Sequence, residues 1–166
     1  MEAIFLDCGA GGPQLKRNPL GCERRVFRLT LIPIPEAHDD ASFFRGTITL
    51  GNHSEEFLAA AWLWDADRYE RQWRDAARDL LAERDRSAFI TSFIHPDAHH
   101  NVIWPAWRVG RIVYIQNHLT SRHQLHGVLD VDHIHRFVRE RSTTTEDGQA
   151  VSEWVVTLDE LAAFAA

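Results

Sequence analysis

A long amphipathic segment, DADRYERQWRDAARDLLAER at residues 65–84, limits the fold of this chain more than any other feature. Its apolar side chains recur at spacings of three and four, which places them on one face of an α-helix. They are Ala66, Tyr69, Trp73, Ala76, Ala77, Leu80 and Leu81. Asp67 followed by Glu70 predicts a capping box, and Glu70 with Arg74 predicts an i, i+4 ion pair. Because the apolar face must be buried, the rest of the chain has to supply a surface that covers it.

Alternating apolar and polar runs on both sides of this helix predict strands that can supply such a surface. Before the helix such runs lie at residues 26–34 and 43–51, and after it at 87–94, 101–107 and 111–119. Residues 3–6 and 56–64 are further candidate strands, and the alanines of 56–64 also suit a helix. Gly110 predicts a hairpin between the last two runs. The run from residue 111 is apolar on both faces, with Tyr114 and Ile112 opposite Val113, Ile115 and Leu119, which predicts a central strand. Pro105 cannot donate to a ladder, so we expect its strand at an edge or with a bulge.

The C-terminal quarter predicts one more hairpin and a short helix. The Asp147–Gly148 pair is typical of a turn between strands within residues 136–156. Thr157 and Glu160 are spaced as a capping box for a helix over LDELAAFA. Strands, a long helix, further strands and a short helix together indicate an α+β fold with mostly antiparallel sheet. At 166 residues the chain suits a single domain, residues 1–166.

The charge distribution narrows the classes of partner. The chain has a formal charge of −6, and residues 130–166 carry eight carboxylates against three arginines. Nucleic-acid affinity is mostly neutralisation of phosphates by Lys and Arg, so we expect no nucleic-acid partner and favour a basic one. No apolar run approaches the roughly 20 residues of a membrane span, and the first residues lack a signal-peptide pattern. We therefore expect a cytoplasmic protein without a membrane partner.

Histidines are concentrated in one region, which raises the question of a metal or nuclease site. The stretch VLDVDHIHRF, residues 128–137, holds two of eight histidines that lie within residues 95–135. VDHIH resembles the first half of an HNH nuclease motif, but no asparagine follows Asn117 and no histidine follows His135 to complete it. His118 begins one H-x-T tripeptide of a two-histidine phosphoesterase, and the second tripeptide is missing. The pairs His123 with His126 and His133 with His135 match no specific zinc spacing.

Two alternatives from other classes stay open on these residues. The first is a metal-dependent nuclease or phosphoesterase that uses the histidine-rich region 95–135. The second is a single-stranded nucleic-acid binder, which the six tryptophans allow and the acidic balance disfavours. We expect loop histidines instead, with no metal, no cofactor and no enzymatic activity.

Four sequence blocks together carry a resemblance to a known family. They are DRYERQWRDAARDLL, SAFITSF, WPAWRVGRIVYIQNHL and TEDGQAVSEWVVTLDEL, and they span roughly residues 54–164. In order and spacing they resemble the immunity proteins of bacterial contact-dependent growth inhibition systems. Residues 1–53 and the segment 118–136 match no block of that family.

The resemblance implies a cytoplasmic protein that binds and inactivates the C-terminal toxin domain of its cognate effector. Such toxins are often nucleases, and some immunity proteins of this kind have a Whirly-like arrangement of two antiparallel sheets with helices. The blocks are mainly scaffold, so we interpret Trp73, Tyr114 and Trp154 as core aromatics.

A basic substrate cleft in a nuclease toxin would be complementary to an acidic surface on this chain. On this hypothesis the toxin-binding residues are Glu55, Glu56, Asp130, Asp132, Glu146 and Asp147. His133 and His135 are further candidates, which would make the contact depend on pH.

Overall fold

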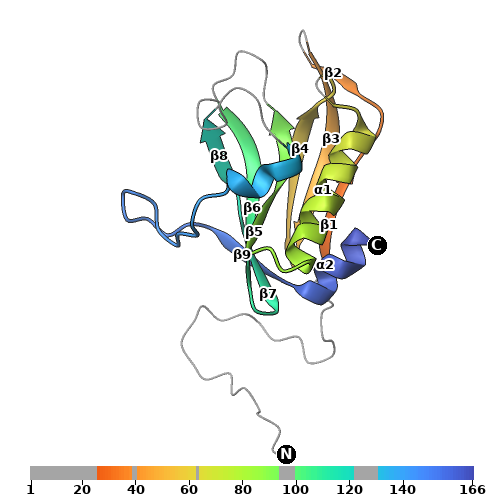
Figure 1. Cartoon of the computed structure of the whole chain (residues 1–166). Helices are drawn as coiled ribbons and strands as arrows, with labels where there is room; N and C mark the ends of the chain where they lie inside the picture. The colour runs from red at the N-terminus through yellow and green to blue at the C-terminus, as the bar shows by residue number, and fades with distance from the viewer. Residues whose placement is uncertain (1–25, 39–40, 63, 94–99, 122–130) are drawn as a thin grey trace, which may run out of the picture.

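The computed structural model describes residues 26–38, 41–62, 64–93, 100–121 and 131–166, and they form two antiparallel sheets with two α-helices (Figure 1). The first sheet contains β1 (Phe27–Leu31), β2 (Glu36–His38), β3 (Ala41–Leu50) and β4 (His53–Ala60). Strand β3 is central, with β1 and β2 in succession along one side and β4 along the other.

The second sheet contains β5 (Arg86–Phe93), β6 (His100–Val109), β7 (Ile112–Gln116), β8 (His118–Ser121) and β9 (Glu153–Thr157). Strand β6 is flanked by β5 on one side and by β7 and β8 on the other, and β9 extends the sheet beyond β7. The helices are α1 (Ala66–Leu81), the 3-10 helix η2 (Val131–Arg136) and α2 (Leu158–Ala165). This architecture confirms the predicted α+β class. No helix in the described part of the chain is long and apolar enough to cross a membrane.

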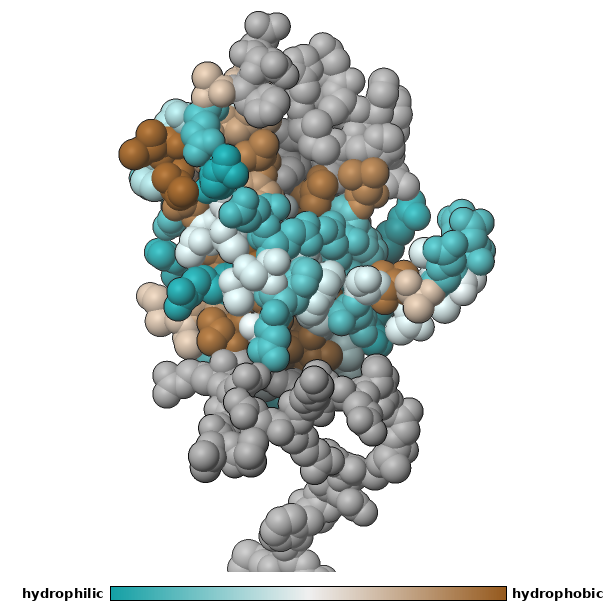
Figure 2. Space-filling model, turned by 180° about the vertical axis from the view of Figure 1, so that it is seen from behind, coloured by the Kyte–Doolittle hydropathy of each residue, from teal (hydrophilic) through white to brown (hydrophobic). Residues whose placement is uncertain are grey.

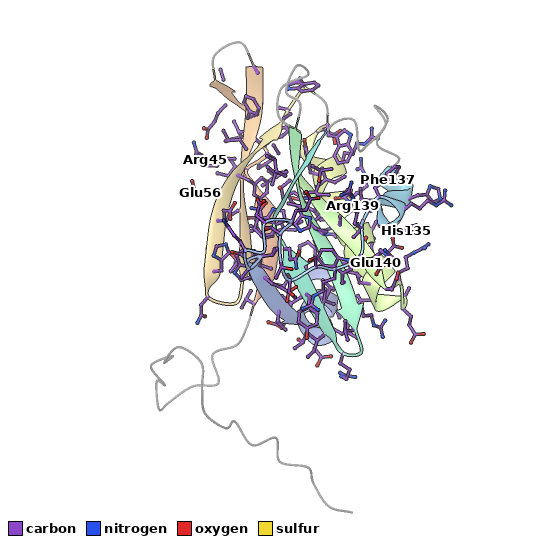
Figure 3. The ribbon with its side chains drawn as sticks, turned by 90° about the vertical axis from the view of Figure 1, so that its left-hand side faces the viewer. Arg45, Glu56, His135, Phe137, Arg139 and Glu140 are labelled. Carbon is purple, nitrogen blue, oxygen red and sulfur yellow. The ribbon has the colours of Figure 1, made fainter. Side chains whose placement is uncertain are left out.

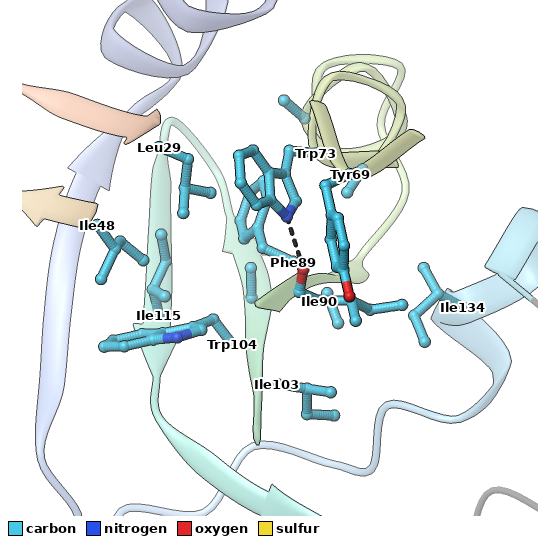
Figure 4. Close-up of a cluster of buried hydrophobic side chains, with 14 of the residues drawn as sticks. Leu29, Ile48, Tyr69, Trp73, Phe89, Ile90, Ile103, Trp104, Ile115 and Ile134 are labelled. Carbon is cyan, nitrogen blue, oxygen red and sulfur yellow. Dashed lines mark hydrogen bonds between the residues drawn. The ribbon is translucent and has the colours of Figure 1, made fainter. Parts of the chain in front are cut away.

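The core lies where the inner faces of both sheets meet α1 and α2 (Figure 4). Leu29 and Ile48 reach it from the first sheet, and Phe89 and Ile115 reach it from the second. Trp73 of α1 is fully buried among them, with its ring edge-on to Phe57. The alternation read from the sequence in β1 and β3 is therefore confirmed as burial. The run predicted over 56–64 is a strand only as far as Ala60.

Helix α1 also closes the free edge of the second sheet. Strand β5 is the outermost strand, and the side-chain amide of Gln72 lies along it as a neighbouring strand would. Gln72 Nε2 donates to the Ala88 carbonyl at 2.8 Å, and Gln72 Oε1 accepts from the Ile90 amide at 3.0 Å. Trp73 Nε1 donates to the Ile90 carbonyl at 2.7 Å (Figure 4). Because unpaired edge strands invite pairing with other chains, this contact both positions the helix and protects the edge.

The start of α1 differs from the prediction. Asp65 is the N-cap, and its carboxylate accepts from the Arg68 amide at 2.7 Å, so the capping box at Asp67 and Glu70 is wrong. The predicted ion pair between Glu70 and Arg74 is confirmed at 3.6 Å.

Pro105 lies in a central strand, so the expectation of an edge strand is wrong, whereas the alternative of a bulge is met in the pairing with β5, whose register shifts between Ile90 and Ser92. The register that pairs Ala106 with Ile115 and Ile103 with His118 places Pro105 opposite Gln116. Proline has no N–H for this position, and the ladder is interrupted there. The predicted strand 111–119 is consequently divided into β7 and β8, while β7 is central as expected.

The predicted hairpin within residues 136–156 is only partly present. The turn at Asp147–Gly148 is confirmed, with Gly148 at φ 78° and its amide donating to the Thr145 carbonyl at 3.0 Å. Residues 137–142 form no strand, and β9 pairs with β7 instead. The C-terminal capping box is confirmed, since Thr157 Oγ1 accepts from the Glu160 amide at 3.2 Å. The predicted strand at residues 3–6 lies outside the described residues.

Candidate functional site

A groove of about 730 Å³ lies on the outer face of the second sheet. Its floor comes from β6, β7 and β8, with Pro105, Trp107, Gln116 and His118 among the lining side chains. One wall is the segment 137–140 that follows η2. The other wall belongs to the segment that connects Ser142 to β9, including Thr144, Thr145, Glu146 and Val151.

The floor of the groove contains a fully buried carboxamide, that of Gln116. Its Nε2 donates to the Ser142 carbonyl at 2.9 Å and to Glu153 Oε2 at 2.8 Å. Its Oε1 lies 2.8 Å from His118 Nε2. All polar positions of this side chain are therefore used, as the cost of burying an amide requires.

These contacts define the protonation of His118. Gln116 Nε2 is occupied as a donor, so Gln116 Oε1 is the acceptor and His118 Nε2 carries the hydrogen. Burial lowers the pKa of the His118 imidazole, which favours the neutral ring. Its Nδ1 is then free of a proton and is an acceptor by nature.

Arg141 and Glu153 form a bidentate ion pair beside Gln116. The guanidinium donates through Nε to Glu153 Oε2 at 2.7 Å and through Nη2 to Oε1 at 2.6 Å. Arg141 also stacks 3.8 Å above the Tyr114 ring. Hydrogen bonding from Arg141 holds the pKa of the Glu153 carboxyl below its usual range. Tyr114 is half-buried under this pair, so its assignment as a core aromatic is wrong, while that of Trp73 is confirmed.

Residues 143–151 form an arm that projects from the body of the molecule (Figures 1 and 2). Three backbone hydrogen bonds lie within it. The Thr145 amide donates to the Gln149 carbonyl at 2.8 Å and the Val151 amide donates to the Thr143 carbonyl at 3.0 Å, which together make the bridge between Thr144 and Ala150, and the Gly148 amide donates to the Thr145 carbonyl at 3.0 Å. The Gln149 amide also donates to Thr145 Oγ1 at 3.1 Å. Residues 142–150 are all exposed. Figure 2 shows the arm with a hydrophilic end. Glu146 and Asp147 are its charged residues.

The two predicted glutamates of β4 lie on opposite faces of their strand. Glu55 points toward the second sheet, where its Oε1 accepts from Asn117 Nδ2 at 3.1 Å. Glu56 points outward and lies 3.3 Å from Arg45, which also binds Glu36 at 2.9 Å. Both carboxylates are thus already engaged within the chain.

The predicted histidines lie on η2 at the opposite side of the molecule from Glu56 (Figure 3). His135 Nε2 is 3.2 Å from Arg84 Nη1, and its Nδ1 is 4.0 Å from Asp79 Oδ2. The ring of His133 lies 6.0 Å from that of His135. The pKa of the His135 imidazole is below its ordinary value. The largest cause is the partial removal of the ring from water, and the charge of Arg84 adds to it.

Asp132 lies in η2, and Asp130 falls outside the described residues. The predicted set therefore does not form one surface: Glu146 and Asp147 lie on the arm, Glu55 and Glu56 on β4, and the histidines on η2. Within the described ranges, no three His, Cys, Asp or Glu side chains converge as a metal site requires. His95, His99, His123 and His126 lie outside those ranges.

The groove and the buried Gln116 side chain in its floor were not predicted from the sequence. Gln116 and Glu153 stand inside two of the four family-like blocks, which the sequence indicates to be mainly scaffold. A glutamine within an otherwise apolar strand was the one signal that pointed to a buried polar group at this position.

Comparison with known proteins gives a consistent result. A family model described as the CdiI N-terminal domain matches residues 59–164. A protein of Enterobacter cloacae subsp. cloacae named "Immunity protein CdiI" is 25% identical over 119 residues, which cover 71% of this chain and 81% of the relative. A solved CdiA-CT/CdiI toxin and immunity complex from Enterobacter cloacae contains a chain of similar fold, with a TM-score of 0.74 and 23% identity. That match covers 84% of this chain and 96% of the solved one.

Proposed function

Because the chain belongs to the CdiI N-terminal domain family and is an immunity protein of contact-dependent growth inhibition, we propose that it binds and neutralises the C-terminal toxin domain of its cognate effector. The observation that carries this proposal is the family match over residues 59–164. The solved relative belongs to a toxin and immunity complex, which supports a protein partner of the same class. The protein acts in the cytoplasm, by binding rather than by catalysis, and without a cofactor.

The toxin on this proposal is a nuclease, and the mechanism is occlusion of its active site or substrate cleft. A nuclease needs a basic surface to hold phosphates, and a net charge of −6 on the immunity protein is complementary to it. Such an interface would bury about 1,200–2,000 Å² in total. Complementary charges would speed association and exclude wrong partners.

The candidate contact residues remain Glu55, Glu56, Asp130, Asp132, Glu146 and Asp147, with His133 and His135 as further candidates. Their separation over the molecule means that one flat interface cannot use all of them. Different members of the set are therefore alternatives to one another. Whether a carboxylate is already paired within the chain helps to choose between them.

The proposal is tested by co-expression with the toxin domain encoded at the end of the reading frame immediately upstream. Cells that express this domain alone should stop growing, and cells that also express the chain should grow. The two proteins should co-elute as one complex in size-exclusion chromatography. Growth arrest despite co-expression, with no complex, would remove the immunity proposal for this pair.

Occlusion and nuclease activity are tested separately on the purified toxin. It should degrade labelled RNA or DNA, and a stoichiometric amount of the chain should stop the cleavage. An uncleavable substrate analogue should compete with the chain for the toxin. Complex formation without such competition would contradict occlusion while leaving immunity intact.

A further inference from the structure

The arm, residues 143–151, is ordered although only Val151 at its end is partly buried. Its residues up to Ala150 are exposed, and the backbone hydrogen bonds that order it run within the arm. Fixing an exposed loop in one conformation opposes folding through its entropy. An arm held this way is prepared for a contact outside its own chain.

The charge at the arm's tip is available for such a contact. Within the described part of the chain, no ion pair uses Glu146 or Asp147, and residues 143–151 contain no Lys, Arg or His. Glu56, by contrast, is paired with Arg45. Among the candidate residues whose side chains the structure describes, the two carboxylates of the arm thus offer uncompensated negative charge.

Both ends of the arm are fastened to the sheet at one point. Arg141 and Glu153 flank the segment and close it with two hydrogen bonds of 2.7 Å and 2.6 Å. Gln116, at the end of β7, donates from Nε2 to both the Ser142 carbonyl and Glu153 Oε2. We call these three side chains, Gln116, Arg141 and Glu153, the clasp.

The groove continues from the arm onto the sheet. Thr144, Thr145 and Glu146 of the arm form part of its lining, together with Arg139 and Glu140. A partner segment that contacts the arm's tip can therefore extend into a concave surface, which gives more contact than a projecting turn alone.

We propose that the arm and the groove beside it are the docking surface for a basic segment of the toxin domain, and that the clasp holds the arm in its binding conformation. This rests on the proposed function, since the occupant is the toxin. Lys or Arg side chains of the toxin pair with Glu146 and Asp147, and the segment that carries them lies in the groove. Gln116, Arg141 and Glu153 are positioning residues that need not touch the toxin.

The charge of the arm is tested with the double variant Glu146→Gln/Asp147→Asn. Its control is Glu70→Gln/Asp75→Asn, which removes two negative charges from α1, where each carboxylate is paired with an arginine. The arm variant should associate with the toxin about tenfold more slowly than wild type. The control should associate at the wild-type rate. Equal rates for wild type and both variants would overturn the proposal.

The arm itself is tested by shortening it. The Val151 amide donates to the Thr143 carbonyl, and a two-residue Asn-Gly turn suits such a pair, so Asn-Gly replaces residues 144–150. Because the removed residues are exposed, thermal stability should stay at the wild-type level while toxin binding and protection are lost. Wild-type affinity in a folded, shortened protein would overturn the inference alone. Failure of the wild-type protein to bind at all would overturn the proposed function.

The clasp is tested with Arg141→Met, with Arg136→Met as the matched control. Amide hydrogen exchange at Gly148, Gln149 and Val151 should accelerate about tenfold or more, while exchange in α1 and β5 stays unchanged. The cost of neutralising Glu146 and Asp147 should shrink in the Arg141→Met background, because a loosened arm no longer presents them. Additive losses, or faster exchange throughout the molecule, would contradict a positioning role.

Discussion

Gly46 shows how one missing side chain shapes the first sheet. It pairs with Phe57 across β3 and β4, and the Phe57 ring lies over it. A Cβ at this position would come within 2.3 Å of the ring and 2.9 Å of the Thr30 carbonyl oxygen. This cross-strand contact between the ring and Gly46 favours the observed register of β3 and β4.

Gly46→Ala should therefore destabilise the protein by about 1–3 kcal/mol, because the added methyl group has no space. Urea unfolding measures this free energy. Phe57→Leu removes the ring edge, so adding Gly46→Ala to that variant should cost less than in wild type. Strictly additive losses would show that the ring is not what limits the site.

His118 makes stability depend on pH. Burial lowers the pKa of its imidazole below the ordinary value of 6.5, so under acid the unfolded chain binds a proton that the folded one resists. The free energy of unfolding is therefore at its full value above pH 6.5. It falls as the pH drops from 6.5 through the lower pKa of the folded state. His118→Gln keeps a donor for Gln116 Oε1 but cannot titrate.

We expect wild type to lose more stability than His118→Gln between about pH 7.5 and about pH 5.5. Thermal unfolding of both proteins at the two pH values measures the difference. The pKa of His135 is also lowered. Because this residue is present in both proteins, its contribution cancels when their losses of stability are compared. Parallel losses in the two proteins would assign the pH dependence to other groups.

At the scale of elements, the contact between α1 and β5 has a direct energetic test. Gln72→Leu leaves the Ala88 carbonyl and the Ile90 amide without their partner at a buried edge. Two such groups cost about 2–4 kcal/mol together. Arg71→Leu, on the exposed face one residue earlier, is the matched control and should stay near wild type in urea unfolding. Equal effects from the two changes would mean that water replaces Gln72 at this edge.

The elements that the sequence predicted are those in which burial follows the backbone period. Phe27 and Leu29 in β1, and Tyr69 and Trp73 in α1, carry a signal within a few neighbouring residues. The division between β7 and β8 depends on Pro105 in a different strand, so local alternation could not reveal it. The start of α1 was misplaced because Asp65 and Asp67 are both good caps and only the actual contacts distinguish them.

The candidate site was harder to predict because its contacts join residues that are far apart in the sequence. Gln116 meets Ser142 and Glu153, which are 26 and 37 residues away in the chain. Spacing along the sequence carries no information about such a meeting. The turn at Asp147–Gly148 was predictable because its chemistry is local, whereas its role as the tip of an arm depends on how the clasp closes the segment.

For the whole molecule, charge governs the approach of a partner. A formal charge of −6 and an acidic arm should make toxin binding weaken as salt increases. From about 0.01 M to about 1 M salt the Debye length falls from about 30 Å to about 3 Å, so the association rate should fall far more than the dissociation rate changes. Stopped-flow mixing with the toxin measures both rates. An association rate independent of salt would leave shape, and not charge, as the basis of recognition.

The separation of the arm from the core has a consequence for how such proteins diverge. Because residues 143–150 are exposed and the clasp lies outside them, they can change without disturbing the packing that makes the chain fold. A lineage facing an altered toxin can thus revise its recognition surface in small steps while every intermediate remains a stable protein. On the proposed docking surface, exchanging the arms of two relatives would exchange the toxins from which each protects its cell.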